Sequence, residues 1–167
     1  MTTYLNAIGT AVPDHDIHAA FIGWAEEQLE PRKQLLFSRM AGRSGIAHRW
    51  SVLPPTADGG SPVAPGGFYD VPGLPPTSVR MAAYAKHAPE LALQAIAKLG
   101  TAFDPARVTH LVVASCTGFV APGIDQIVAR KLGLSPTVER VLIGFMGCYA
   151  GVTALRTARY GARSAMR

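Results

Sequence analysis

The chain has 167 residues, of which 49% are hydrophobic and 16% charged, and its formal net charge is +5. Such a low charged fraction excludes a disordered chain, and the length allows one domain with a sizeable core. The last twelve residues hold four arginines and no acid while the rest is nearly neutral, so the charge does not indicate a nucleic-acid-binding face.

The first third of the chain predicts a strand and two short helices. The apolar stretch Tyr4–Ile8 ends at a glycine and a Val-Pro-Asp turn, which is typical of a strand leading into a loop. Asp16 follows as a candidate helix cap. Apolar residues then recur at three- and four-residue intervals over 18–29 and again over 35–40, and this spacing predicts two helices.

Residues 54–76 interleave seven prolines with five glycines. Neither a helix nor a central strand tolerates that density. We expect a long surface loop within one domain, because neither the segment before it nor the segment after it looks able to fold on its own.

From residue 77 the pattern alternates between helices and buried strands. It predicts a helix over 77–99 that Pro89 kinks, a strand over 110–114, a helix over 125–132, a strand over 141–145 and a helix from about Cys148. Continuous β-branched runs separated by helices indicate an α/β sheet.

Neither a membrane span nor a secretory signal is recognisable, because no window reaches about 18 consecutive apolar residues. We therefore expect a cytoplasmic protein. The two cysteines, Cys116 and Cys148, predict no disulfide framework and lack metal-ligand spacing.

Cys148 is the candidate nucleophile. It stands where a buried strand turns into a helix, and the unpaired N–H groups and positive dipole of a helix start favour a thiolate there. Gly147 and Gly151 remove bulk around the sulfur, much as in a nucleophile elbow. The alternative, a plain buried small residue, is about equally consistent with the local sequence.

Cys116 makes a weaker case, because no helix follows it immediately. Lining of a pocket or simple packing is the favoured interpretation, with a nucleophilic role as the alternative.

The segments Thr109–Phe119, Ala121–Asp125 and Ile143–Gly151, in this order and spacing, resemble the N-terminal half of a type III polyketide synthase, the chalcone and stilbene synthase family. The related 3-oxoacyl-carrier-protein synthases share the nucleophile-elbow arrangement of the cysteine, but the residues that surround their cysteine differ from those in this chain. The resemblance implies the N-terminal half of a thiolase-like α/β fold, a mixed sheet with helices on both faces. It covers residues 1–158, and residues 159–167 are read as a divergent basic tail.

The resemblance also implies an acyltransferase. Cys148 matches the cysteine that takes a starter acyl group from acyl-CoA, before condensation with malonyl-CoA. Cys116 and Thr117 match positions beside the starter pocket. Pro122 and Gly123 match a turn that crosses a homodimer interface, and Ala121 stands where plant enzymes carry a methionine.

Arg39 and Arg43, one helical turn apart, match two of the family's three basic contacts to coenzyme A phosphates, whereas Leu36 replaces the third. Guanidinium groups at this spacing suit a phosphate. A solvated basic helix face is the alternative. No metal or cofactor is expected beyond the acyl-CoA and malonyl-CoA substrates, and neither nucleic acid nor a membrane is expected as a partner.

The family's catalytic His and Asn have no match in this chain, whose five histidines fall elsewhere and whose one asparagine is Asn6. We therefore expect a truncated chain with reduced activity. Two further interpretations remain: a non-catalytic remnant that binds coenzyme A or a partner chain, and a condensing enzyme like 3-oxoacyl-carrier-protein synthase III.

Overall fold

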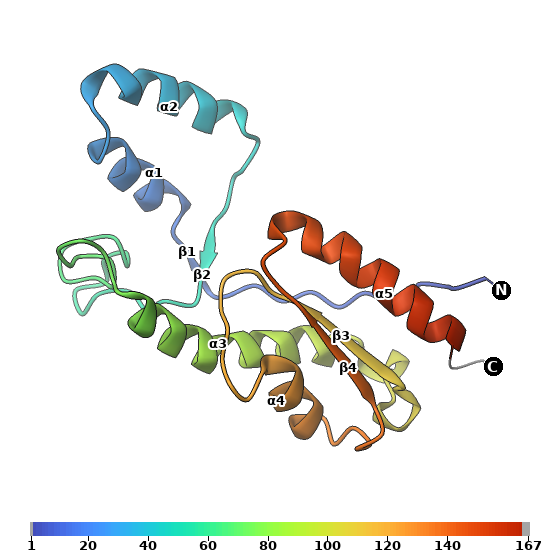
Figure 1. Cartoon of the computed structure of the whole chain (residues 1–167). Helices are drawn as coiled ribbons and strands as arrows, with labels where there is room; N and C mark the ends of the chain where they lie inside the picture. The colour runs from blue at the N-terminus through green and yellow to red at the C-terminus, as the bar shows by residue number, and fades with distance from the viewer. Residues whose placement is uncertain (1, 165–167) are drawn as a thin grey trace. The chain divides into compact units, whose positions relative to one another are not determined.

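The computed structural model describes residues 2–164, which divide between two compact units (Figure 1). One unit comprises Met1–Ala11 and Arg80–Arg167, and the other comprises Val12–Val79. Each unit has its own pair of hydrogen-bonded strands.

The unit of residues 12–79 is a helical hairpin closed by a short ladder. The helices α1 (His18–Glu27) and α2 (Pro31–Arg43) confirm the two predicted helices. The strands β1 (His15–Asp16) and β2 (Trp50–Ser51) pair antiparallel on either side of them. Asp16 Oδ1 accepts the backbone N–H of His18, the first residue of α1, so the carboxylate satisfies one of the free donors there.

The proline- and glycine-rich stretch has no helix or strand up to α3 (Thr77–Ala97), as predicted, yet it is built from hydrogen-bonded turns. Pro62 is fully buried. The Tyr69 N–H donates to the Pro62 carbonyl at 2.9 Å, and the Tyr69 ring lies 6.4 Å from that of Trp24 on α1. The loop is therefore anchored to the helical hairpin by aromatic packing.

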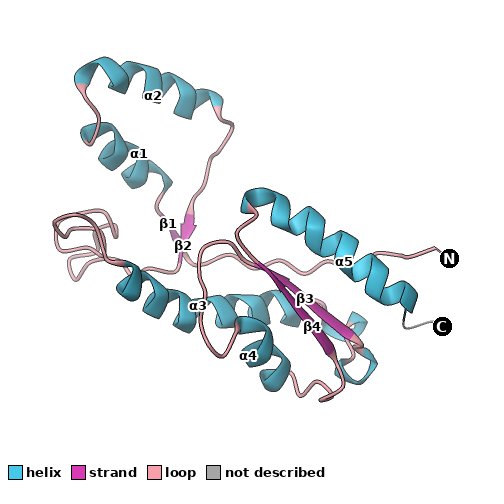
Figure 2. Cartoon of the chain, in the orientation of Figure 1, coloured by secondary structure: helices cyan, strands magenta, loops and turns pink. Residues whose placement is uncertain are grey.

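The second unit contains a β-α-β-α segment. The strands β3 (His110–Ala114) and β4 (Glu139–Ile143) are parallel and joined through α4 (Ile124–Lys131), and β4 leads through the 3-10 turn Gly147–Tyr149 into α5 (Ala150–Ser164). Figure 2 shows α4 and α5 on opposite sides of the strand pair. Two short 3-10 turns, Gly100–Ala102 and Pro105–Arg107, precede β3. The predicted α/β class is confirmed.

The core of this unit lies where the helices meet the strands. Where these helices and strands meet, the buried apolar residues among the described ones are Ile124, Val128, Val138 and Ala150. Arg140 on β4 pairs with Asp125 in the first turn of α4 at 3.2 Å. An acidic side chain at that position also suits the helix dipole, so the pair holds α4 against β4.

Three of the predicted elements differ from the structure. The strand predicted over Tyr4–Ile8 is wrong: this segment joins no ladder, and its apolar side chains Tyr4, Leu5 and Ile8 are exposed. A strand needs a hydrogen-bonding neighbour, and none of residues 2–164 supplies one here. The second core strand begins earlier than predicted, at Glu139, because Glu139 pairs with His110. The helix α3 (Thr77–Ala97) ends at Ala97 instead of at the predicted residue 99, and it continues through the buried Pro89.

The residues predicted to form a divergent basic tail, 159–167, begin inside a helix. α5 continues through Arg159 to Ser164, and residues 165–167 of that tail lie outside the described residues.

Candidate functional site

The site lies at the carboxyl ends of β3 and β4, where side chains of adjacent parallel strands meet. The register pairs Ala114 with Ile143, the last residues of the two strands. The Ser115 N–H donates to the Ile143 carbonyl at 2.9 Å. The loops that carry Cys116 and Cys148 therefore leave the sheet side by side.

Cys148 is exposed and lies in the 3-10 turn that opens α5. The backbone reaches it through two residues with left-handed conformation, Phe145 at φ 57° and Gly147 at φ 61°. Glycine adopts this conformation without cost. The first N–H groups of a helix lack partners within it and favour negative charge nearby. The guanidinium of Arg156 lies 5.7 Å from the centre of the ring of Tyr149, the residue after Cys148.

Cys116 is half-buried, and its Sγ donates to the carbonyl oxygen of Gly147 at 3.3 Å. Gly147 directly precedes Cys148. The structure thus brings the two cysteine turns into contact, which the sequence did not predict.

Aromatic residues reinforce this contact. The rings of Phe119 and Phe145 stack at 4.1 Å with an interplanar angle of 9°. Phe145 is 81% exposed even so. The stack joins the loop after β3 to the loop after β4.

The remaining predicted pocket residues follow Cys116 along the chain. Thr117 is exposed, as are Ala121 and Pro122, which are joined by a cis peptide bond. Gly123 is the N-cap residue of α4. This turn borders a groove of about 520 Å³ lined by Pro122, Gln126, Ile127, Arg130 and Lys131.

Tyr84 is a supporting residue that the sequence analysis missed. Its hydroxyl donates to Ser115 Oγ at 2.6 Å, and its ring lies against the buried Gly118. A Cβ at Gly118 would stand 2.2 Å from the ring. The glycine between Thr117 and Phe119 was the available signal, because glycine often marks a close approach.

Arg39 and Arg43 lie exposed on α2, in the unit of residues 12–79. No ion pair engages either of them among the described residues. A groove of about 580 Å³ runs between α1 and α2, lined in part by Ser38, Gly42 and Glu26. The hydroxyl of Ser38 donates to the Glu26 carboxylate.

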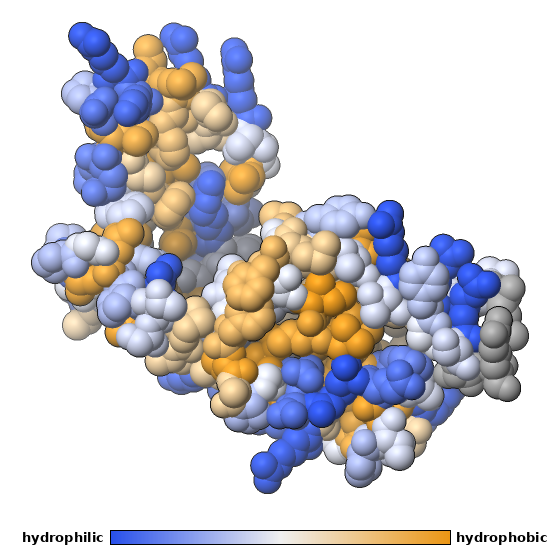
Figure 3. All heavy atoms as spheres, viewed as in Figure 1, coloured by the Kyte–Doolittle hydropathy of each residue, from blue (hydrophilic) through white to orange (hydrophobic). Residues whose placement is uncertain are grey.

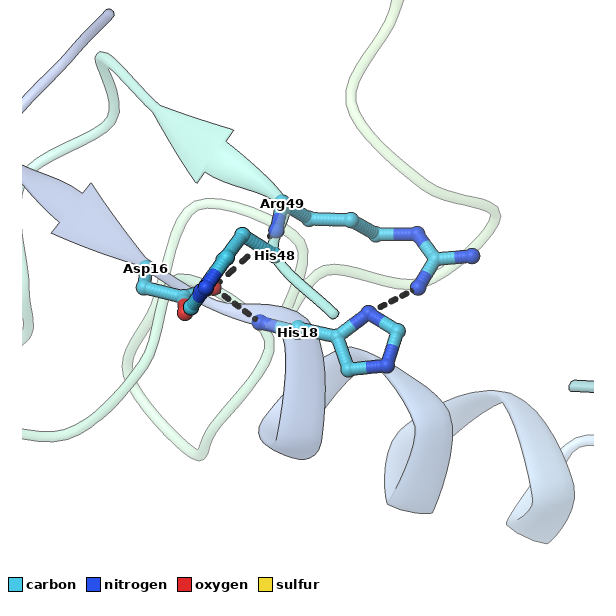
Figure 4. Close-up of polar contacts among 4 residues, drawn as sticks. All are labelled: Asp16, His18, His48 and Arg49. Atoms are coloured by element: carbon cyan, nitrogen blue, oxygen red, sulfur yellow. Dashed lines mark hydrogen bonds and ion pairs between the residues drawn. The ribbon is translucent and has the colours of Figure 1, made fainter. Parts of the chain in front are cut away.

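The same unit contains a polar cluster at the base of the hairpin (Figure 4). The carboxylate of Asp16 accepts from the backbone N–H groups of His18 and Arg49, each at 3.0 Å, and contacts His48 Nδ1 at 2.6 Å. These contacts, that with His48 foremost, lower the pKa of Asp16 from 3.8 to about 2. Arg49 also hydrogen-bonds His18. The cluster ties β1 to β2.

His110 is the first residue of β3, as predicted, and its Nε2 lies 3.5 Å from Glu139. Within residues 2–164, no group of three or more potential ligand side chains is placed to hold a metal ion. None of the helices described there combines the length and apolar character needed to cross a membrane.

Comparisons with known proteins agree on one family. Residues 2–165 match the family described as chalcone and stilbene synthases, N-terminal domain. The alpha-pyrone synthesis polyketide synthase-like protein of Mycobacterium tuberculosis is 34% identical over 138 residues, which cover 80% of this chain and 33% of that protein. This chain therefore spans about a third of the relative's length.

Two solved structures extend the likeness to the fold. A type III pentaketide synthase from Neurospora crassa has a TM-score of 0.73 at 27% identity, covering 93% of this chain and 40% of that one. The acylalkylpyrone synthase CsyB of Aspergillus oryzae, solved with coenzyme A, has a TM-score of 0.67 at 25% identity, covering 92% and 39%. The chain belongs to the chalcone and stilbene synthase family of type III polyketide synthases, and it carries the N-terminal part of their thiolase-like fold.

Proposed function

We propose that this chain provides the acyl-loading site of a type III polyketide synthase, with Cys148 as the nucleophile. The Cys148 thiolate attacks the thioester carbonyl of a starter acyl-CoA, coenzyme A leaves as a thiolate, and the acyl group stays on Cys148 as a new thioester. The observation that carries the proposal is the exposed sulfur at the start of α5, beside the loop from the neighbouring strand.

The residues after β3 are proposed to contact the starter acyl chain. Cys116 stands against the turn before Cys148, which supports a role in shaping the pocket. Thr117, Ala121, Pro122 and Gly123 continue the same loop as far as α4. In this proposal the Ala121–Gly123 turn also reaches across a homodimer interface, and the exposure of Ala121 and Pro122 leaves them available for that contact.

Arg39 and Arg43 are proposed to bind the phosphates of coenzyme A. Residues four apart on a helix share a face, and both guanidinium groups are exposed. The CsyB structure, which contains coenzyme A, adds support from a relative. Charge-assisted hydrogen bonds to a phosphate are among the stronger polar contacts.

Calorimetry with coenzyme A tests these two arginines. Arg39→Ala and Arg43→Ala should each weaken binding about tenfold, the loss of one charge-assisted hydrogen bond. Lys33→Ala is the matched control, because Lys33 lies on the same helix and pairs with Glu30 at 3.3 Å. Equal losses in all three variants would reduce the effect to net charge and contradict the assignment.

Acyl transfer is tested by intact mass after incubation with an acyl-CoA. The folded chain should gain one acyl group, which proteolytic mapping should place on Cys148, and Cys148→Ser should gain none. The urea-unfolded chain exposes both thiols and serves as the control for unspecific acylation. Acylation spread equally over both cysteines in the folded chain would contradict the proposal.

Condensation with malonyl-CoA is the second step we propose for the complete enzyme. Within the 167 residues no side chain matches the family's His and Asn, which would stabilise the enolate and the oxyanion. For this chain alone we expect loading without extension, so adding malonyl-CoA should not lengthen the acyl adduct. A chain that binds coenzyme A but is never acylated would favour the alternative, a non-catalytic binding protein.

A further inference from the structure

The two cysteines stand at one edge of the β3–β4 pair, although 31 residues separate Cys116 from its contact Gly147. The Cys116 Sγ lies 3.3 Å from the Gly147 carbonyl oxygen, and a single peptide bond joins that carbonyl to Cys148. The described chain has no other cysteine. Any disulfide within the described chain therefore has to join Cys116 and Cys148.

The two thiols differ in access. Cys148 is exposed, with the N–H groups of the α5 start next to it, whereas Cys116 is half-buried beneath the turn. An exposed cysteine reacts with a dissolved oxidant before a half-buried one, because oxidation depends on access to the sulfur. A second thiol within reach can then resolve the oxidised product.

The turn has the freedom that such a bond requires. A disulfide needs the two Cα atoms about 4.4–6.8 Å apart. Gly147 has no side chain and an exposed, left-handed backbone with open space where a Cβ would stand. No side chain at Gly147 resists a change in its backbone angles, so this glycine is the point at which the turn can bring Cys148 toward Cys116.

We propose that Cys116 is the resolving thiol for Cys148 in a reversible oxidation by hydrogen peroxide. In the first step the Cys148 thiolate attacks one peroxide oxygen, the O–O bond breaks, and with one proton the products are a Cys148 sulfenic acid and water. In the second step the Cys116 sulfur attacks the Cys148 sulfur, the S–O bond breaks, and the hydroxyl leaves with the Cys116 proton as water. Peroxide is reduced and the two thiols become one disulfide.

The disulfide would protect Cys148 from irreversible damage. A sulfenic acid left unresolved is oxidised further to sulfinic acid, which thiols do not reverse. While it exists, the bond also occupies the nucleophile of the proposed acyl transfer. The inference concerns the same site but does not depend on acylation, so either can fail alone.

Intact mass before and after peroxide tests the proposal. The wild-type chain should lose two hydrogens, peptide mapping should recover Cys116 linked to Cys148, and dithiothreitol should restore the starting mass. Cys116→Ser should instead gain one and then two oxygens on Cys148, with the two-oxygen form resisting dithiothreitol. Trapping of sulfenic acid by dimedone should rise several-fold in this variant.

A displaced thiol provides the matched control. Ser135 follows α4 and lies before β4, at the opposite end of that strand from Cys148. In Cys116→Ser with Ser135→Cys, peroxide should still add oxygens and form no internal disulfide. A disulfide in this control, oxygen addition without hydrogen loss in the wild type, or a bond between two chains on a non-reducing gel would each overturn the proposal. Far-ultraviolet circular dichroism confirms that each variant is folded.

Discussion

Phe145 and Gly147 determine how the chain enters the cysteine turn. Both have positive φ angles, a region that glycine adopts freely and that costs other residues about 1–2 kcal/mol. For Phe145 the stack with Phe119 compensates, because offset aromatic pairs contribute about 0.5–1.5 kcal/mol beyond burial. Cys148 is thus presented by backbone geometry that neighbouring rings maintain.

At Gly118 we predict that a single methyl group destabilises the unit. A Cβ there would meet the Tyr84 ring at 2.2–2.4 Å, and overpacking of this kind costs about 1–3 kcal/mol. Gly118→Ala should lower the free energy of unfolding by that amount in urea titrations. Gly151→Ala is the control, because nothing lies within 4 Å of its Cβ position near the start of α5, and it should change the free energy of unfolding by less than about 0.5 kcal/mol. Equal stability of the two variants would contradict the close approach.

Asp16 provides a prediction about pH. Its pKa is lowered from 3.8 to about 2, mainly by the hydrogen bond with His48. Because the folded value is the lower one, the contacts of the carboxylate stabilise the fold fully above the unfolded value of 3.8 and are lost as pH falls through about 2. His48→Ala should raise the Asp16 pKa toward 3.8 in a carboxyl NMR titration. His15→Ala, the neighbour in β1, is the control and should leave it unchanged.

Local sequence is informative about single residues only where the cause is local. The position of Cys148 between a strand and a helix was predictable, because a strand, glycines and a helix start follow one another along the chain. The contact of Cys116 with Gly147 depends on strand order, and that of Tyr84 with Ser115 depends on how α3 packs. Neither contact can be predicted from the pattern of a single segment. The catalytic roles themselves remain predictions from the family resemblance.

At the scale of elements, periodicity predicted the helices and both core strands. It failed at Tyr4–Ile8 because apolar composition shows that a segment prefers an extended conformation but does not show what it pairs with. The two-residue strands β1 and β2 are too short to produce any alternation. Their pairing follows from the hairpin that they close.

α4 should be the most sensitive helix to loss of volume. Val128 is 2% exposed on the face of α4 that packs against the strands, so Val128→Ala should cost about 2 kcal/mol through lost burial and the cavity left behind. Val152→Ala on α5 removes the same atoms at a site that is 45% exposed and should stay within about 0.5 kcal/mol of wild type. Urea midpoints compare the two variants. A larger loss of stability in Val152→Ala than in Val128→Ala would contradict the assignment of Val128 to the core.

At the scale of the whole molecule, exposed apolar surface is large relative to the core. Figure 3 shows apolar side chains gathered over the β3–β4 strands on the side toward the viewer. Exposed apolar residues on β4 and directly after it include Val141, Phe145 and Met146. Contiguous apolar surface of this kind promotes association. The sequence predicted the strands but not which of their faces would remain uncovered.

Self-association should therefore depend on concentration in sedimentation experiments. If the proposed dimer forms through the turn after β3, Ile127→Glu in the adjoining groove should weaken it by at least about tenfold, because it places an unpaired charge at the interface. Tyr160→Glu on α5 carries the same charge on a 64% exposed residue and should leave association unchanged. If Tyr160→Glu weakens association and Ile127→Glu does not, the contact between chains is made by α5 instead.

The β1–β2 ladder has one further consequence. It holds His15 beside Ser51 and Asp16 beside Trp50, so the helical hairpin leaves and rejoins the chain at a single point. A segment whose ends are fixed together can be lengthened, shortened or exchanged without redirecting the chain that flanks it. Grafting of another hairpin between Asp16 and Trp50 is thus a natural route to a chimeric protein, and in evolution the same point could accept insertions independently of the cysteine turn.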